Sequence, residues 1–240
     1  MELIADLHVH TVASGHAYST IQENVAEANK KGLKIFGLSD HGPCVAGAPS
    51  FHYFRALRFV PRYIEGVLIL RGAEANIVST SGKIDIPEHC LKSLDYTMVG
   101  FHAVDEYPPS QDVAVNTSAM IAAMDNPYIK VITHAGNPKF PVDYDAVVRA
   151  AKDKGVAVEI NNSSLVSSRE GGEGNCRHIA KLVAKYGALA VIGSDAHISF
   201  DVGRFTEALE AVKVAGIPEE NIINADRDRL FKFLGLDIQT

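Results

Sequence analysis

Short apolar runs alternate along the chain with longer segments that carry helical signals. Seven runs of mostly aliphatic residues, each followed by a polar residue, lie at 2–7, 35–38, 67–70, 96–100, 130–133, 156–160 and 189–192. Near-continuous apolar runs of this length are typical of strands buried on both faces, as in a parallel sheet. The pattern therefore predicts seven parallel strands.

The segments between these strands predict helices. Thr20 and Glu23 match a capping box, and Lys30-Lys31-Gly32 supplies a basic last turn and a glycine stop. Further helices are predicted at 54–64, 116–124, 143–154, 175–186, 201–215 and 226–234, and residues 83–87 are predicted to be an excursion after the third strand. Each strand is thus followed by a helix, as in a chain of βα units.

Polar residues end the predicted strands at nearly regular intervals. They are His10, His41, Glu74, His102, His134, Asn161 and His197, which lie 31, 33, 28, 32, 27 and 36 positions apart. One strand, one helix and two loops need about thirty residues. An open doubly wound sheet fits less well, because its ligands gather at one switch point. We predict an α/β fold, a TIM-like (βα)7 barrel, with residues 1–240 forming a single domain.

Metal-binding side chains are expected to meet at the carboxyl ends of the strands. In an extended strand, residues two apart share a face, so His8 pairs with His10 at the start of the chain and Asp195 pairs with His197 near its end. Because these strand ends form one rim in a βα barrel, the rim collects His8, His10, His16, His41, Glu74, His102, His134, Asp195 and His197. Nine donors exceed one tetrahedral site and could hold up to three ions.

The donor types narrow the choice of metal. Imidazoles with a few carboxylates and no thiolate suit zinc, iron or manganese better than calcium or magnesium. The donor types leave zinc open, with manganese or iron possible in its place. Asp40, next to His41, is predicted either to orient a ligand histidine or to form a salt bridge within the barrel.

Composition and charge limit the function classes. The net charge is −6, from 23 basic and 29 acidic side chains, and no run of Lys or Arg marks a surface that would follow a nucleic-acid backbone. The charge therefore argues against a dedicated nucleic-acid-binding protein.

The three cysteines, Cys44, Cys90 and Cys176, have neither disulfide nor zinc-knuckle spacing, so we expect reduced thiols and a cytoplasmic protein. Neither a signal sequence nor an apolar run of ~18 residues is present, which argues against membrane insertion. The sequence leaves open whether the protein forms a homo-oligomer.

The ordered motifs resemble those of the PHP (polymerase and histidinol phosphatase) superfamily. They are Asp-Leu-His-Val-His at 6–10, His16, Ser-Asp-His at 39–41, Gly-Ala-Glu at 72–74, His102, Thr-His-Ala at 133–135 and Gly-Ser-Asp-Ala-His at 193–197. The resemblance covers essentially the whole chain, and Glu-Ile-Asn-Asn-Ser at 159–163 is most similar to stand-alone phosphatases of the YcdX type.

This resemblance implies a distorted seven-stranded barrel with a trinuclear, usually zinc, site. One metal would take His8, His10, Glu74 and Asp195; a second would share Glu74 and add His102 and His134; a third would take His16, His41 and His197. Glu74, Asp195 and His197 would act in catalysis through the ions that they hold.

The charge of such a site indicates its substrate. Three divalent ions and two ligand carboxylates leave about +4, which a phosphate dianion and a hydroxide formed from metal-activated water would neutralise. We therefore predict a phosphatase that acts on small phosphomonoesters. Arg169, in a long loop at 165–174, and His52, after the second strand, are candidate substrate-binding residues, although a solvated loop charge is the favoured interpretation of Arg169.

Two other functions remain open. One is phosphodiester cleavage of nucleotides or single-stranded DNA, which the acidic balance disfavours. The other is a non-catalytic metal-binding scaffold, which is disfavoured because closed structural sites usually saturate each ion with four protein ligands.

Overall fold

The strands lie close to the positions that the apolar runs predict. The computed structural model describes residues 1–166 and 169–238 of the chain. Its seven main strands are β1 (Ala5–Val9), β2 (Ile35–Leu38), β4 (Val67–Arg71), β6 (Thr97–Gly100), β7 (Ile129–Ile132), β8 (Ala157–Asn161) and β9 (Ala190–Gly193). Two short strands complete the third unit: β3 (Tyr63–Ile64), antiparallel to β4, and β5 (Glu74–Asn76), which follows β4. The predicted α/β class is confirmed.

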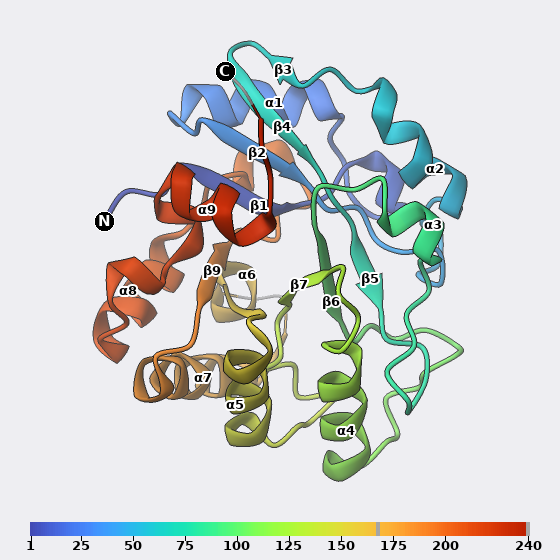
Figure 1. Cartoon of the computed structure of the whole chain (residues 1–240), viewed down its shortest axis with the longest axis vertical. Coiled ribbons are helices and arrows are strands. Elements are labelled where there is room, and N and C mark those ends of the chain that lie inside the picture. Colours follow the sequence, from blue (N-terminus) through green and yellow to red (C-terminus); the bar gives the residue numbers. More distant parts are fainter. Residues whose placement is uncertain (167–168, 239–240) are drawn as a thin grey trace.

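The strands form two sheets that meet at two seams. One sheet has the order β1-β2-β4-β3 and the other β5-β6-β7-β8-β9. At the first seam, a parallel bridge joins His41 to Glu74. At the second, the N–H of His10 donates to the carbonyl of Ala196 (2.9 Å), and the N–H of Ala196 donates to the carbonyl of His8 (3.3 Å). These seams bring the first and last strands together in a distorted barrel (Figure 1).

The barrel interior is apolar and is closed at one end by the last helix. A core cluster takes one or two side chains from each of the seven main strands together with Leu230 and Leu234 of α9 (Arg227–Leu234). Inside it, the hydroxyl of Tyr96 donates to the carbonyls of Leu7 (2.6 Å) and Leu38 (3.1 Å). Because α9 packs among the residues at the amino ends of the strands, the opposite, carboxyl rim is left for the polar side chains.

Helices cover the outside of the barrel (Figure 1). They are α1 (Ile21–Lys30), α2 (Phe51–Ala56), α3 (Glu88–Leu91), α4 (Val113–Ala123), α5 (Tyr144–Lys154), α6 (Asn162–Val166), α7 (Glu173–Tyr186), α8 (Thr206–Ala215) and α9. The capping box predicted for α1 is present, with Thr20 and Glu23 each accepting from the other's backbone N–H. Within residues 1–166 and 169–238, no helix combines the length and apolar character that a bilayer span requires.

The helix predicted at 54–64 is wrong. The chain forms α2 at Phe51–Ala56, a 3-10 turn at Leu57–Phe59 and then β3. Pro61 explains the early end, because the residue before a proline is driven away from helical geometry, and Val60 is extended with φ −70° and ψ 125°. In the predicted loop 165–174, α6 extends to Val166 and α7 begins at Glu173, while residues 167–168 lie outside the described part.

Candidate metal centre

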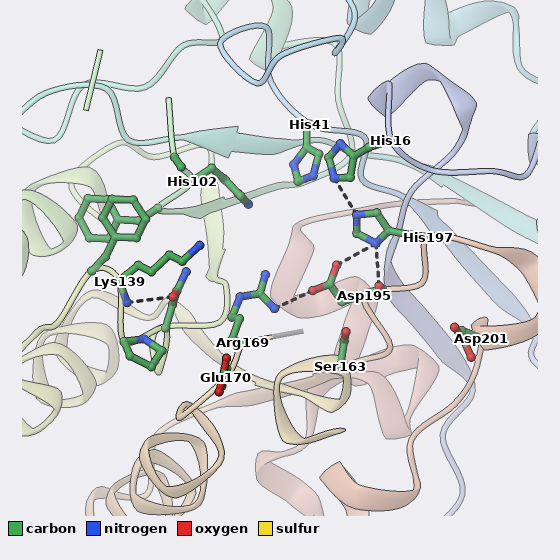
Figure 2. Close-up of a pocket in the computed structure, with 15 residues that line it drawn as sticks. His16, His41, His102, Lys139, Ser163, Arg169, Glu170, Asp195, His197 and Asp201 are labelled. Atoms are coloured by element: carbon green, nitrogen blue, oxygen red, sulfur yellow. Dashed lines mark hydrogen bonds and ion pairs between the residues drawn. The ribbon is translucent and has the colours of Figure 1, made fainter. Parts of the chain in front are cut away.

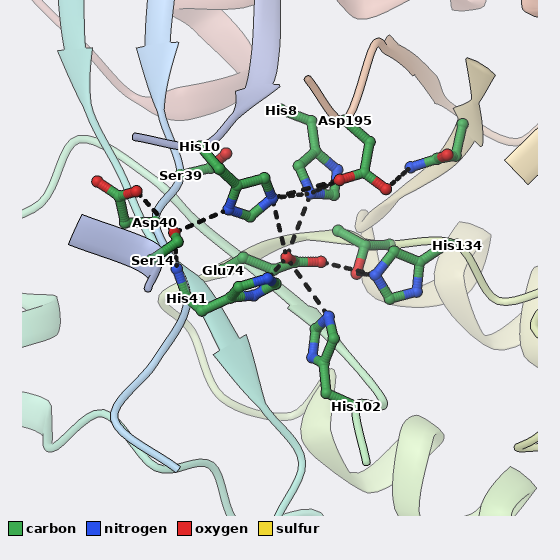
Figure 3. A network of polar contacts seen from close by, with 12 residues as sticks. His8, His10, Ser14, Ser39, Asp40, His41, Glu74, His102, His134 and Asp195 are labelled. Carbon is green, nitrogen blue, oxygen red and sulfur yellow. Dashed lines mark hydrogen bonds and ion pairs between the residues drawn. The ribbon is translucent and has the colours of Figure 1, made fainter. Parts of the chain in front are cut away.

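All nine predicted ligands meet at the carboxyl rim of the barrel (Figures 2 and 3). His8 lies within β1 and Glu74 opens β5, while the other donors sit in the loops that follow the strands. The two members of each predicted pair lie close together, with His8 Nε2 3.1 Å from His10 Nε2 and His197 Nδ1 3.6 Å from Oδ1 of Asp195. His16 joins them from the loop after β1, where its Nε2 lies 3.1 Å from Nε2 of His197.

Glu74 is the centre of this cluster (Figure 3). Its side chain is buried, and its Oε1 lies 2.8 Å from Nε2 of His134. Its Oε2 faces four imidazoles, at 3.2 Å from His8, 3.5 Å from His10, 3.0 Å from His41 and 3.5 Å from His102. A carboxylate with imidazoles around both oxygens is placed to bridge two cations.

Several of these donor atoms have no hydrogen-bond partner within the described residues. They are Nδ1 of His41, both ring nitrogens of His102 and Oε2 of Glu74. Buried polar atoms left unpaired cost about 1–3 kcal/mol each, and two facing imidazole nitrogens at 3.1 Å can share at most one proton. Cations would satisfy these lone pairs together, so the residues fit a metal centre.

The spacing of the donors is compatible with more than one ion. Three overlapping triads each bring one donor atom per residue within 4.8 Å of the others: His8, His10 and Glu74; His10, His41 and His197; and His41, Glu74 and His102. The cluster can therefore bind metal.

Electrostatics keep two carboxylates and two imidazoles of the cluster in the ionisation states that a cation requires. Burial opposes ionisation of Glu74 and Asp195, but nearby histidines, and Arg169 beside Asp195, outweigh it and hold both pKa values well below their usual range. Burial lowers the pKa of His10 and His102 well below the usual value, so these two imidazoles stay neutral and keep a lone pair. Carboxylates are thus available as anions and imidazoles as donors.

A buried carboxylate to which the sequence motif assigned no role orients His8. Oε1 of Glu159 lies 2.6 Å from Nδ1 of His8, so His8 can donate this ring N–H and direct Nε2 toward the cluster. Oε2 of Glu159 accepts from the N–H of His134 (2.9 Å). Burial would lower the pKa of His8, yet Glu159, Glu74 and Asp195 raise it well above the usual value. In the sequence, the feature that could have pointed to Glu159 is its position as a lone charged residue in an otherwise apolar predicted strand.

A second chain of contacts orients His10. The hydroxyl of Ser14 donates to Oδ1 of Asp40 (2.7 Å) and lies 3.1 Å from Nδ1 of His10. Asp40 also accepts from the N–H of Thr11 (2.7 Å) and the hydroxyl of Tyr53 (2.6 Å). Of the two alternatives for Asp40, the structure therefore favours orientation of a ligand histidine, acting through Ser14.

Backbone strain and one close approach also set the geometry. His134 and Asp195 have φ of 29° and 57°, in the left-handed region that non-glycine residues rarely adopt. Such strain costs on the order of 1–3 kcal/mol and clusters at functional sites. A Cβ at Gly193 would lie 2.3 Å from Oε1 of Glu159 and 2.9 Å from Cβ of His8, so only glycine permits this contact between the two side chains.

An open cavity of about 840 Å³ lies over the cluster and admits a substrate. Arg169 lines it, with Nη1 donating to Oδ2 of Asp195 (3.0 Å) and to the hydroxyl of Ser164 (2.8 Å). His52 is exposed on α2, packs against the ring of Phe51 and does not line this cavity. The structure thus brings Arg169, but not His52, to the cluster.

Comparison with known proteins agrees with this geometry. The model of the PHP domain family matches residues 6–163. A relative from Thermoanaerobacter sp. (strain X514) named "probable phosphatase" is 50% identical over 234 residues, 98% of this chain and 95% of the relative. Another from Enterobacter sp. (strain 638), with the same description, is 48% identical over 229 residues, covering 95% of this chain and 93% of the relative.

Among solved structures, the fold is similar to that of the histidinol phosphate phosphatase of Lactococcus lactis, which was crystallised with zinc, L-histidinol and phosphate. The TM-score is 0.63 and the identity 14%, with 89% of this chain and 94% of that chain covered. At this identity the likeness supports the barrel fold.

Proposed function

The chain belongs to the PHP domain family, and on that premise we propose that it is a metal-dependent phosphatase of small phosphomonoesters. The observation that carries the proposal is the convergence of nine donors, several of them buried without hydrogen-bond partners, beneath an open cavity. In the reaction, a water oxygen bonds to phosphorus, the ester P–O bond breaks, and the leaving group departs as an alcohol with a proton that water supplied.

We propose up to three ions, zinc first, with manganese or iron in place of some. The sets are His8, His10, Glu74 and Asp195; Glu74, His102 and His134; and His16, His41 and His197. His41, whose Nδ1 lies 3.0 Å from Oε2 of Glu74, adjoins the first two sets as well as the third. When bound, divalent ions would supply a hydroxide nucleophile near neutral pH and neutralise phosphate charge.

The chain's own side chains would orient the ligands and the substrate. Glu74 would bridge two ions, Glu159 would fix the ring of His8, and Arg169 would hold phosphate oxygens at the cavity wall. Since Nη1 of Arg169 already contacts Asp195, the arginine would link the substrate to a ligand carboxylate. His52, away from the cavity, has no such support.

The proposal includes a location in the cytoplasm. Cys44, Cys90 and Cys176 are all free thiols, which supports a reducing compartment such as the cytoplasm. Self-association stays a prediction.

The test is turnover of p-nitrophenyl phosphate by protein stripped of metal and then given zinc or manganese. We expect activity only after metal is returned, and none on labelled single-stranded DNA, which separates monoester from diester cleavage. Anomalous diffraction at a metal edge, from crystals soaked with phosphate, would count and identify the ions. Stoichiometric metal without turnover of any phosphate ester would instead favour a scaffold protein.

A further inference from the structure

One lysine reaches into the cavity from the wall opposite His16 and His197. Lys139 lies in the loop between β7 and α5, and Figure 2 shows its ammonium group directed into the space between His102 and Arg169. Lys139 is exposed, and within residues 1–166 and 169–238 its Nζ makes neither a hydrogen bond nor an ion pair. A cation thus faces the cavity without a partner among the described residues.

The backbone holds this lysine in place. The N–H of Asn137 donates to the carbonyl of His134 (3.0 Å), and the N–H of Lys139 donates to Oδ1 of Asn137 (3.1 Å). The next residue, Phe140, is 2% exposed and its ring stacks on that of Phe101, with the centroids 5.2 Å apart. The loop therefore holds the backbone of Lys139 between two anchored residues, Asn137 and Phe140.

The acidic residues of the cavity do not neutralise Lys139. Asp195 pairs with Arg169 at 3.0 Å, and Asp201 pairs with Arg204 at 3.2 Å. Glu170 forms no ion pair with Lys139, and in Figure 2 its carboxylate points away from it. An anion entering this side of the cavity would therefore find an unused positive charge.

We propose that Lys139 binds an anionic group, a carboxylate or a second phosphate, on the leaving group of the substrate. The proposal rests on the phosphatase function proposed above: with the reacting phosphate at the cluster, the leaving group would lie in the rest of the cavity, whose lining includes Lys139, Pro138 and Phe140. The substrate class is thus a phosphomonoester that carries a further negative charge several bonds from the ester. Histidinol phosphate, whose leaving group is cationic, does not fit this wall.

The test compares matched pairs of esters on the metal-loaded enzyme. The carboxylate arm is the ratio of kcat/KM for 3-phosphoglycerate over glycerol 3-phosphate, and the phosphate arm is the ratio for fructose 1,6-bisphosphate over fructose 6-phosphate. A hydrogen bond to a charged partner is worth about tenfold or more in binding. We expect at least one ratio to fall about tenfold in Lys139→Met and to recover in Lys139→Arg.

Binding without turnover supplies an independent readout. Titration calorimetry would compare 4-phosphonobutyrate with butylphosphonate, and the preference for the former should fall in Lys139→Met. Lys181→Met, at an exposed lysine of α7, is the matched control and should leave every ratio unchanged.

The outcomes separate the two proposals. If both kcat/KM ratios and the phosphonate preference are the same in Lys139→Met as in the wild type, the role of Lys139 is wrong and the phosphatase function stands. If the metal-loaded wild type hydrolyses none of the four esters and no p-nitrophenyl phosphate, the phosphatase function itself is wrong, and the inference falls with it.

Discussion

Two groups of buried polar side chains lie along the seam between β1 and β9, and they differ in whether the chain satisfies them. Near the amino end of β1, Nδ2 of Asn224 donates to the carbonyls of Ala5 and Ile192 (both 2.8 Å), and its Oδ1 accepts from the N–H of Ile192 (3.1 Å). Asp6, next along β1, accepts from the N–H groups of Ser194 (3.2 Å) and Gly203 (2.8 Å). We call Asp6 and Asn224 the seam group.

At the carboxyl rim, the nine proposed metal ligands form the rim group, whose atoms face one another without enough protons to pair them. The described residues satisfy the hydrogen bonds of the seam group, whereas they leave several buried atoms of the rim group without a hydrogen-bond partner. Since a buried polar group must find a partner, the first arrangement serves folding and the second serves a ligand. Substitutions in the two groups should therefore separate stability from metal binding.

The largest expected effect is that of His10→Ala in the rim group. Loss of a ligand shared by two of the triads should lower phosphatase activity by about 10³-fold or more, because the ions supply the nucleophile and the charge stabilisation. Metal content, activity on p-nitrophenyl phosphate and circular dichroism would be measured together, with His178→Ala, at an exposed histidine of α7, as the control. Loss of the dichroism spectrum along with activity would show that His10 is a structural anchor.

Asn224→Ala tests the seam group and should give the opposite result. Three buried hydrogen bonds are lost, so the free energy of unfolding should fall by about 3 kcal/mol, while metal bound per folded molecule stays unchanged. Urea titration would measure the free energy of unfolding, and metal analysis would measure the metal bound per folded molecule. Asn29→Ala, at an exposed position in α1, controls for the loss of an amide. A large loss of metal from folded Asn224→Ala would mean that the two groups are coupled.

Glu159→Gln sharpens the comparison, because Glu159 supports the rim group without belonging to it. The substitution keeps the shape but weakens the acceptor for Nδ1 of His8, and such changes cost about 10–100-fold in metal affinity. Competition with a zinc-binding dye would measure the affinity. Glu173→Gln, at an exposed residue that begins α7, is the matched control. A metal affinity equal to that of the wild type would show that Glu159 does not support metal binding.

The smallest effect is expected for Ser14→Ala. The hydroxyl joins Asp40 to Nδ1 of His10, but Asp40 keeps its contacts with Thr11 and Tyr53. The hydroxyl also accepts from the N–H of His41 (3.1 Å), but His10 loses only one hydrogen bond of about 1 kcal/mol, which should weaken metal binding roughly fivefold. The same dye competition would detect it, with Ser81→Ala as the control. A loss as large as that of Glu159→Gln would mean that the two orienting contacts are equivalent.

The sequence predicted the strands and the rim group because both repeat with the βα unit. Each apolar run marks a strand, and the residue that ends it is fixed to one edge of the barrel by the parallel topology. Both i, i+2 pairs, at His8 and at Asp195, were readable in the same way. The helix predicted at 54–64 is wrong because Pro61 drives Val60 out of helical geometry.

The supporting residues have no such period. Glu159 lies inside a strand, and its role depends on β8 packing against β1 through Gly193, which sequence spacing does not reveal. Asn224 belongs to a short 3-10 turn far along the chain from the strands that it joins. Such roles arise from tertiary contacts between segments about 30 to 220 residues apart, so the folded structure is needed to find them.

Because the first and last strands meet at the seam, bound ions would also reduce the conformational entropy of the unfolded chain. An ion held by both His8 and Asp195 closes a loop of about 190 residues, as a reversible cross-link would. The entropy removed by such a cross-link grows with the logarithm of loop length, so this is near the largest gain that a chain of 240 residues can obtain. The same cations that take part in the reaction would thus also link the first and last strands of the barrel. Metal supply would then govern the lifetime of the protein as well as its activity.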